Sequence, residues 1–208
     1  MITVACVLRS GGDFTPEYVS RLQAGVAANL QEPHRFVCLS DVDVPCERIP
    51  LITTWPGWLS KIELFRPGLF EAGALYFDLD TVILGDVTPL VAFDHRFTML
   101  SDFQKPVRPA SGVMAWSGDY SRIFSEFSDD LVAEYKDFAP NFGDCGWIVS
   151  RLGHEPERFQ NVLPGLIGSY KEWLPSKAAV CCFHGRPRPA DVGWSAAGAW
   201  NRRALRVA

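Results

Sequence analysis

The hydrophobic positions in the first half of the chain follow two different patterns, an unbroken run and a helical spacing. An unbroken apolar run at residues 2–8 predicts a buried strand, and Val19, Leu22 and Val26 recur at helical spacing within a predicted helix at 15–30. The same patterns predict, further along, strands at 35–40, 48–52 and 74–77 and a helix at 58–65. This order of elements predicts an α/β fold with a mostly parallel central sheet flanked by helices.

The second half of the chain is less regular in its hydrophobic pattern. Its predicted elements are strands at 97–100, 112–116 and 180–183 and helices at 119–135 and 144–152. A chain of 208 residues with no internal repeat and no clear linker fits a single domain. We divide this domain into a β-α-β half at 1–86, a second half at 87–190 and a C-terminal tail at 191–208.

Composition and charge argue against several classes of protein. The net charge of −4 provides no basic field to attract nucleic acid, and the six cysteines include no C-x-x-C pair that would indicate a zinc cluster. No apolar stretch approaches the roughly 18 residues of a transmembrane segment, and the N-terminal run is too short for a signal peptide. We therefore expect a cytoplasmic protein. Its basic C-terminal segment either touches a membrane surface or is solvated, and contains Trp200, Arg202, Arg203 and Arg206.

An acidic pair, Asp78 and Asp80, interrupts the apolar sequence at the end of the strand predicted at 74–77. Burying bare carboxylates among apolar residues costs roughly several kcal/mol, so a metal ion or the reaction chemistry is expected to hold them. Side chains two residues apart on a strand point to the same face, and two carboxylates there suit Mg²⁺ or Mn²⁺. The alternative interpretation is a strand followed by a turn in which Asp caps a loop.

A histidine and two arginines follow the last predicted strand. His184 offers an imidazole as a third ligand beside the two carboxylates, and Arg186 and Arg188 would meet a phosphate near the metal. Taken alone, His184 is more typical of a loop histidine that hydrogen-bonds to the backbone than of a metal ligand. The combination of acidic pair, histidine and arginines favours a metal and phosphate site.

Four short stretches spread over residues 76–189 carry a resemblance to a known family. They are YFDLDTV at 76–82 with Gly85 and Asp86 following, SGVM at 111–114, GDC at 143–145 and FHGRPRP at 183–189. In that order they resemble the DxD strand, the N-[AS]-G-V-M strand, the D-Q helix start and the closing H-x-G-x-x-K-P segment of family 8 glycosyltransferases. The chain is thus similar to the glycogenin and bacterial lipooligosaccharide galactosyltransferase group, and the resemblance implies a GT-A fold.

The resemblance also implies a function and a set of site residues. It implies a nucleoside diphosphate sugar as donor, with a UDP-sugar expected first, and a glycan, lipid or protein acceptor. Carried over by position, the ligands of Mn²⁺ or Mg²⁺ are Asp78, Asp80 and His184. The positions implied for the donor are Leu8, Arg9, Lys61, Asp78, Ser111, Gly112, Gly185 and Arg188, with Lys61 and Arg188 on the diphosphate. Asp144 would contact sugar hydroxyls or assist the chemistry as the catalytic residue.

The chain departs from the family pattern at three positions. Ala110 stands where the family has Asn, Cys145 where it has Gln, and Arg188 where it has Lys. The first two changes remove amides from the sugar pocket, so they bear on donor identity and on the retention of configuration typical of the family. If the reaction inverts configuration, a carboxylate must be the general base, and Asp144 and Asp102 are both candidates. If it retains configuration, the leaving phosphate itself is the proposed base.

Two other functions are compatible with parts of the sequence. The segment FDLDTV at 77–82 also resembles the first motif of haloacid-dehalogenase-type phosphatases, in which Asp78 would be the nucleophile and Asp80 the acid/base, with Mg²⁺. That motif usually lies on the first strand, whereas several elements precede it here. A non-catalytic sugar-nucleotide-binding domain is the second alternative, because seven tryptophans are available to stack on sugar rings.

Overall fold

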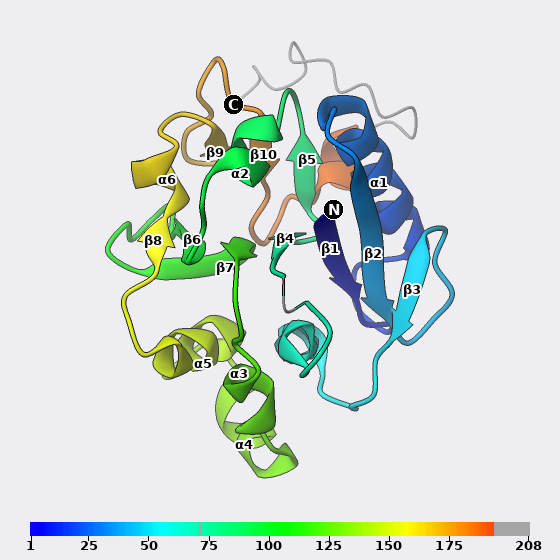
Figure 1. Ribbon diagram of the computed structural model, residues 1–208, viewed down its shortest axis with the longest axis vertical. Coiled ribbons are helices and arrows are strands. Elements are labelled where there is room, and N and C mark those ends of the chain that lie inside the picture. Colours follow the sequence, from blue (N-terminus) through cyan, green and yellow to red (C-terminus); the bar gives the residue numbers. More distant parts are fainter. Residues whose placement is uncertain (71, 194–208) are drawn as a thin grey trace.

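The computed structural model describes residues 1–70 and 72–193 and contains a seven-stranded sheet of order β3-β2-β1-β4-β7-β6-β8 (Figure 1). The strands of this large sheet are β1 Ile2–Leu8, β2 His34–Ser40, β3 Glu47–Pro50, β4 Ala74–Phe77, β6 Phe97–Ser101, β7 Pro109–Trp116 and β8 Glu157–Arg158. A small sheet of order β5-β10-β9 consists of β5 Thr81–Ile83, β9 Ile167–Ser169 and β10 Val180–Cys182. The tail positions Trp200, Arg202, Arg203 and Arg206 lie outside the described residues.

The large sheet is mostly parallel, as predicted. Strand β1 pairs in parallel with β2 and β4, β2 with β3, and β6 with β8. Strand β7 runs antiparallel to both of its neighbours, β4 and β6. The prediction of an α/β fold with a mostly parallel central sheet flanked by helices is therefore confirmed.

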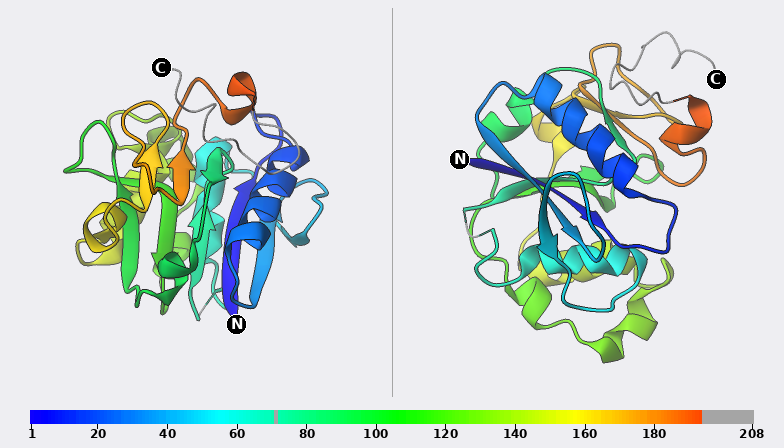
Figure 2. Two further views of the ribbon diagram at one scale, coloured as in Figure 1. Left: turned by 90° about the horizontal axis from the view of Figure 1, so that it is seen from above. Right: turned by 90° about the vertical axis from the view of Figure 1, so that its right-hand side faces the viewer.

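Helices cover both faces of the large sheet, as Figure 2 shows. The α-helices are α1 Pro16–Asn29, α2 Thr88–Ala92, α3 Arg122–Ser125, α4 Asp129–Tyr135, α5 Gly143–Leu152 and α6 Phe159–Val162, and the 3-10 helices are η1 Gly57–Phe65 and η2 Pro189–Val192. None of the described helices is long and apolar enough to cross a membrane.

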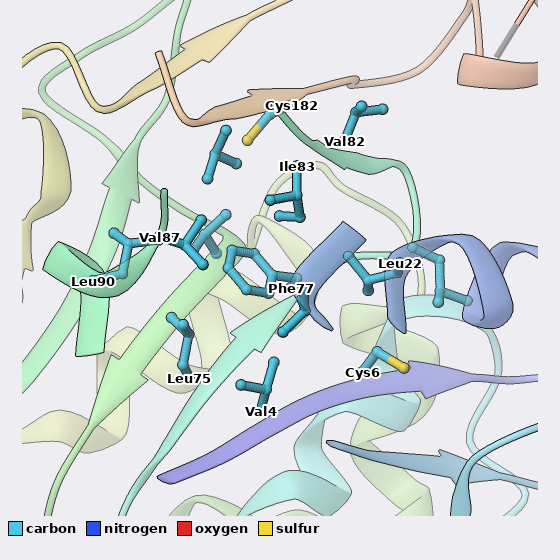
Figure 3. Close-up of a cluster of buried hydrophobic side chains, with 14 of the residues drawn as sticks. Val4, Cys6, Leu22, Leu75, Phe77, Val82, Ile83, Val87, Leu90 and Cys182 are labelled. Atoms are coloured by element: carbon cyan, nitrogen blue, oxygen red, sulfur yellow. The ribbon is translucent and has the colours of Figure 1, made fainter. Parts of the chain in front are cut away.

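Strand β1 supplies side chains to two separate apolar clusters because its side chains alternate between faces. Val4, Cys6 and Leu8 join the cluster under α1, whereas Ala5 and Val7 join the one formed with η1 and α5. Both faces are buried, which explains why residues 2–8 form an unbroken apolar run rather than an alternating one. Figure 3 shows part of the first cluster, with Phe77 of β4 at its centre.

The acidic pair lies on the short link that carries the chain from the large sheet to the small one. Asp78 and Asp80 follow β4 and precede β5. The backbone N–H of Asp78 donates to the carbonyl of Gly112 on β7 at 2.8 Å, and the N–H of Phe183, just after β10, donates to the carbonyl of Asp80 at 3.1 Å. The link is therefore fixed to both sheets, which brings the acidic pair close to the segment that follows β10.

Several predicted elements differ from the structure. The helix predicted at 119–135 is two short helices, α3 and α4, because Phe127 between them turns into the core while Ser128 has an extended backbone at the start of α4. The helix predicted at 58–65 is the 3-10 helix η1. Elements α2, α6, β5, β8 and β9 were not predicted, because segments of two to five residues show no measurable period.

Replacing Phe77 by alanine tests the central cluster of Figure 3. Phe77 is fully buried, so Phe77→Ala leaves a cavity and is expected to lower the free energy of unfolding by about 3–5 kcal/mol. Ile52→Ala is the matched control because Ile52 is largely exposed, and its effect is expected to be within about 0.5 kcal/mol. Urea denaturation followed by circular dichroism measures both, and equal destabilisation by the two substitutions would contradict this account of the core.

Candidate active site

A cleft of about 1130 Å³ opens where the ends of β1, β4 and β10 meet the start of α5. Binding sites of α/β folds lie at such strand ends, and the volume is sufficient for a nucleotide-sized ligand. The residues predicted for the site that line this cleft are Arg9, Lys61, Asp78, Asp80, Asp102, Ser111, Gly112, Asp144, His184, Gly185 and Arg188. Leu8 does not line it, because its side chain is 1% exposed and packs in the cluster under α1.

Asp78 is held by two donors on the floor of the cleft. The ammonium of Lys61 lies 2.9 Å from Asp78 Oδ1, and the hydroxyl of Tyr76 donates to the same carboxylate. Burial raises the pKa of Tyr76, so its hydroxyl keeps the proton that it donates. Tyr76 and Asp78 are two residues apart, which places their side chains on one face of the chain.

Lys61 joins Asp78 to a second carboxylate, that of Asp144 at the start of α5. Its Nζ lies 3.4 Å from Asp144 Oδ2, and the Ser111 hydroxyl donates to that same oxygen at 2.6 Å. Burial by itself would lower the pKa of Lys61, but Asp144 and Asp78 outweigh burial and raise it. Burial raises the pKa of Asp144, while Lys61 and Ser111 oppose that shift. Lys61 therefore stays protonated, and its ammonium balances the charge of both carboxylates.

Asp80 is paired with the second cation of the site. The guanidinium of Arg188 donates to Asp80 Oδ2, and its Nε and Nη2 both lie 3.3 Å from Asp13 Oδ2. The same guanidinium lies 4.8 Å from the ring centre of Phe14. Burial, followed by repulsion from Asp78, raises the pKa of Asp80 to about 7, although Arg188 acts in the opposite direction. Arg188 therefore connects the acidic pair to the turn that follows β1.

His184 is engaged with a serine of the small sheet. Ser169 Oγ lies 2.8 Å from His184 Nε2 and accepts the backbone N–H groups of Lys171 and Glu172, each at 3.1 Å. Because the hydroxyl already accepts two bonds, its own proton is directed to Nε2, so the neutral ring carries its proton on Nδ1. Burial lowers the pKa of His184, and its ring stacks on Phe103 with centroids 5.7 Å apart.

The three residues predicted as metal ligands do not form one cluster. Across residues 1–70 and 72–193, no group of three His, Cys, Asp or Glu side chains is arranged to hold a metal ion. The carboxylates of Asp78 and Asp80 fit a hard divalent cation by chemistry, and burial followed by repulsion from Asp78 raises the pKa of Asp80. Their present partners are Lys61 and Arg188, while Nε2 of His184 is bound to Ser169.

Arg9 fixes the turn at the end of β1 rather than pointing freely into the cleft. Its Nη1 pairs with Asp41 Oδ2 at 3.3 Å, and its Nη2 donates to the carbonyl of Thr53 at 2.7 Å. A second carboxylate near Arg9 is that of Glu63, which is fully buried in η1 and lies 3.8 Å from Nη2. Arg9 thus ties the ends of β1 and β2 to η1, the helix that carries Lys61.

The two departures that remove amides from the family motifs lie beside Ser111 and Asp144. Ala110 lines the cleft with a methyl group, and Cys145 donates its thiol to the carbonyl of Pro109 at 3.3 Å. Burial raises the pKa of Cys145 to about 12, so this thiol stays protonated near neutral pH. Neither side chain replaces an amide as a ligand for sugar hydroxyls.

Three residues that hold the site were not predicted to do so. Tyr76 was detectable from strand period alone, since it precedes Asp78 by two positions. Asp13 and Ser169 carry no comparable signal, because each becomes part of the site only through contacts with residues far along the chain, Arg188 and His184.

Known proteins resemble this chain in structure rather than in sequence. No model of a known protein family matches the sequence, and no curated protein sequence matches it. A crystal structure of the galactosyltransferase LgtC in complex with donor and acceptor sugar analogues is similar over 98% of this chain and 94% of that chain, with a TM-score of 0.64 and 13% identity. The fold is GT-A. This confirms the predicted fold, to which the α/β sheet and the placement of the acidic pair had pointed.

Two larger glycosyltransferases share this GT-A fold. The glycosyltransferase GlyE of Streptococcus pneumoniae TIGR4 is similar over 99% of this chain and 63% of that chain, with a TM-score of 0.64 and 13% identity. The bifunctional glycosyltransferase WbbM is similar over 90% of this chain but only 46% of that chain, with a TM-score of 0.61 and 11% identity. This chain therefore spans less than two thirds of either protein.

Removing the charge of Lys61 tests the central ion group of this GT-A domain. Lys61→Met leaves Asp78 and Asp144 without their shared cation, which is expected to lower the free energy of unfolding by about 3–5 kcal/mol. Adding Asp144→Asn to Lys61→Met removes one uncompensated charge and is expected to recover part of that loss. Urea denaturation measures all variants, with Lys105→Met as an exposed control. If Lys61→Met unfolds at the wild-type urea concentration, the ammonium does not have this structural role.

The raised pKa of Asp80 predicts a pH dependence of stability. In the unfolded chain this carboxyl loses its proton near pH ~4, whereas in the folded protein it does so near pH 7. Between those values the folded state binds more protons, so the free energy of unfolding falls as pH rises. Asp80→Asn removes this contribution and is expected to lose less stability than the wild type between pH 5 and pH 7. Denaturation in buffers containing EDTA, with Asp94→Asn as control, checks this, and parallel curves for wild type and Asp80→Asn would contradict it.

Proposed function

We propose that this protein transfers a sugar from a nucleoside diphosphate sugar, with a UDP-sugar expected first, to an acceptor hydroxyl. The observation that carries the proposal is a single cleft in a GT-A fold that contains the acidic pair, Lys61, Asp144 and Arg188. These residues occupy the positions at which the sequence resembles family 8 glycosyltransferases. The proposed cofactor is Mn²⁺ or Mg²⁺, with Asp78 and Asp80 as its ligands and His184 as the third ligand implied by the resemblance.

The departure of a nucleoside diphosphate builds negative charge on its phosphate oxygens, and this charge must be stabilised as it forms. Arg188 is the residue placed for this task, because its guanidinium lines the cleft beside the acidic pair and presents several N–H donors. A divalent cation, if held by Asp78 and Asp80, would supply further positive charge to stabilise the departing diphosphate. Lys61 lies deeper and is already neutralised by two carboxylates, so we assign it to positioning Asp78 and Asp144.

Asp144 is the carboxylate that we place at the reacting centre. It faces the cleft beside Ser111 and Gly112, the pair proposed to line the sugar pocket. The rival base, Asp102, uses Oδ1 to accept the backbone N–H groups of Gln104 and Lys105, at 2.8 and 3.0 Å. Because Asp102 caps a turn in this way, we assign to Asp144 the contact with a donor hydroxyl or the acceptance of the acceptor's proton.

The alternative functions differ in how well they agree with the fold. A haloacid-dehalogenase-type phosphatase is not supported, since the chain has a GT-A fold. A non-catalytic sugar-nucleotide-binding domain shares the proposed site and is favoured by Ala110 and Cys145, which lack the amides of the family motifs. It predicts donor binding without transfer or hydrolysis.

Donor binding and turnover are tested together. A thermal-shift screen of nucleoside diphosphate sugars, with and without Mn²⁺, is expected to identify one donor that raises the melting temperature most when the metal is present. Calorimetry then compares the affinity of the variants for that donor, with and without Mn²⁺. Asp80→Asn is expected to lose the metal-dependent part of the affinity, whereas Asp94→Asn, a conservative change at an exposed position, keeps it.

Asp144→Asn separates a transferase from a binding domain. In this variant, turnover of the identified donor, measured as release of the nucleoside diphosphate, is expected to fall by about 10²–10⁴-fold, which is more than any change in the donor dissociation constant. Binding without any turnover in the wild type would favour the binding domain. Failure of every donor to bind, with or without metal, would rule out the proposed function.

A further inference from the structure

Four large apolar side chains that line the cleft are exposed. Trp58, Val107, Phe138 and Phe142 are 40, 89, 53 and 37% exposed, and all four line the cleft. They come from η1, from the loop after β6 and from the segment between α4 and α5. Figures 1 and 2 place α4 and η2, which follows Arg188, toward opposite ends of the molecule. Phe138 and Phe142 lie between α4 and α5, whereas Arg188 directly precedes η2, so they come from separate parts of the fold.

The backbone at Phe142 is strained in a way that presents its ring to the cleft. Phe142 has a φ of 64°, and it is the one non-glycine residue with positive φ in the part of the chain that the structure describes. For a bulky side chain this conformation costs about 1–3 kcal/mol and is found preferentially at functional sites. The next residue, Gly143, also has positive φ, and a Cβ there would lie 2.9 Å from Trp58 Nε1.

Local contacts hold the rings in place. The indole of Trp58 donates from Nε1 to the carbonyl of Tyr135 at 3.2 Å, and the Phe138 and Phe142 rings meet edge to face with centroids 5.5 Å apart. Ordered rings lose little conformational entropy when a ligand binds, which is an advantage for recognition. We name Trp58, Phe138 and Phe142 the aromatic rim.

An arginine with free donors lies on the aromatic rim. The guanidinium carbon of Arg108 is 4.7 Å from the ring centre of Phe142, and Arg108 also lines the cleft. Within the described residues, this guanidinium has no carboxylate partner and no side-chain hydrogen bond. In this it differs from Arg188, which is paired with Asp80 and Asp13. A half-buried guanidinium with unused donors beside flat rings matches a ligand that is both ring-shaped and anionic.

We infer that the aromatic rim and Arg108 bind the acceptor, and that the acceptor is a saccharide bearing a carboxylate or a phosphate. This inference rests on the proposed function, since it assigns the second substrate of that reaction. The apolar face of a sugar ring would bury against the rim, and its anionic group would take bidentate hydrogen bonds from Arg108. Asp144 is the second residue of α5, which directly follows Phe142, so a sugar on the rim lies next to the proposed reacting centre.

The test measures binding of three probes to the 208-residue chain by calorimetry. The probes are methyl β-glucuronide, glucose 6-phosphate and the neutral methyl β-glucoside, and UDP with Mn²⁺ is titrated separately. At least one anionic probe is expected to bind roughly tenfold or more tightly than the neutral probe. Arg108→Gln is expected to abolish that preference, and the probe that it weakens identifies the group as carboxylate or phosphate. Phe138→Ala is expected to weaken all three sugars.

Matched controls separate this inference from general effects. Lys105→Gln removes a nearby cation that does not line the cleft, and Trp173→Ala removes an exposed aromatic ring outside it, so both are expected to bind sugars as the wild type does. UDP binding is expected to be unchanged in every variant. Equal affinity for anionic and neutral probes, or a preference that survives Arg108→Gln, overturns the inference. So does an equal loss of UDP binding in Arg108→Gln, because the guanidinium would then serve the donor.

Failure of the proposed function gives a different pattern. One outcome is that UDP does not bind the wild type, while anionic sugar probes still bind more tightly than the neutral probe and this preference depends on Arg108. That outcome would support the saccharide site and contradict the proposed transferase function. If UDP binds and no sugar probe distinguishes Arg108→Gln from wild type, the donor site stands and the assignment of the rim fails.

Discussion

The buried ammonium of Lys61 is the interaction on which the rest of the site depends. It lies between Asp78, at the end of β4, and Asp144, at the start of α5. Without it, the buried carboxylate of Asp144 and the partly buried one of Asp78 would repel each other across the cleft. The 3-10 helix η1 that supplies Lys61 is itself fixed by Arg9 and Glu63, so the geometry of the acidic residues depends on packing well outside the cleft.

The two cations of the site differ in how available their charge is to a ligand. Lys61 has its charge balanced within the fold, whereas Arg188 is shared between Asp80 and Asp13 nearer the surface. A diphosphate that binds to Arg188 therefore exchanges one anionic partner for another instead of meeting an unpaired charge. Such an exchange yields less net affinity for the diphosphate than a free guanidinium would. Additional positive charge beside Asp80 would therefore contribute more to the binding of the diphosphate.

How much was predictable differs between the fold and the site for a physical reason. The first strand was predicted from an unbroken apolar run of 7 residues, and α1 from a helical period that extends over 14 residues. Strands β5 and β9, of 3 residues each, were not, because their pairing with β10 defines them and their own sequences do not. In the site, Asp78 and Asp80 stood out as charges in an apolar run, whereas Asp13 and Ser169 are ordinary loop and strand-end residues until the chain folds.

The position of β10 within the small sheet also determines when the site becomes complete during synthesis. Strands β5 and β9 both pair with β10, and Asp80 meets Arg188, which is 108 residues further along the chain. A nascent chain that ends near α5 already contains Lys61, Asp78 and Asp144, yet it lacks the strand between β5 and β9 and the arginine that pairs with Asp80. Because domains emerge from the ribosome N-terminus first, the large sheet can form early, while the acidic link acquires its last partner only after residues 180–188 appear.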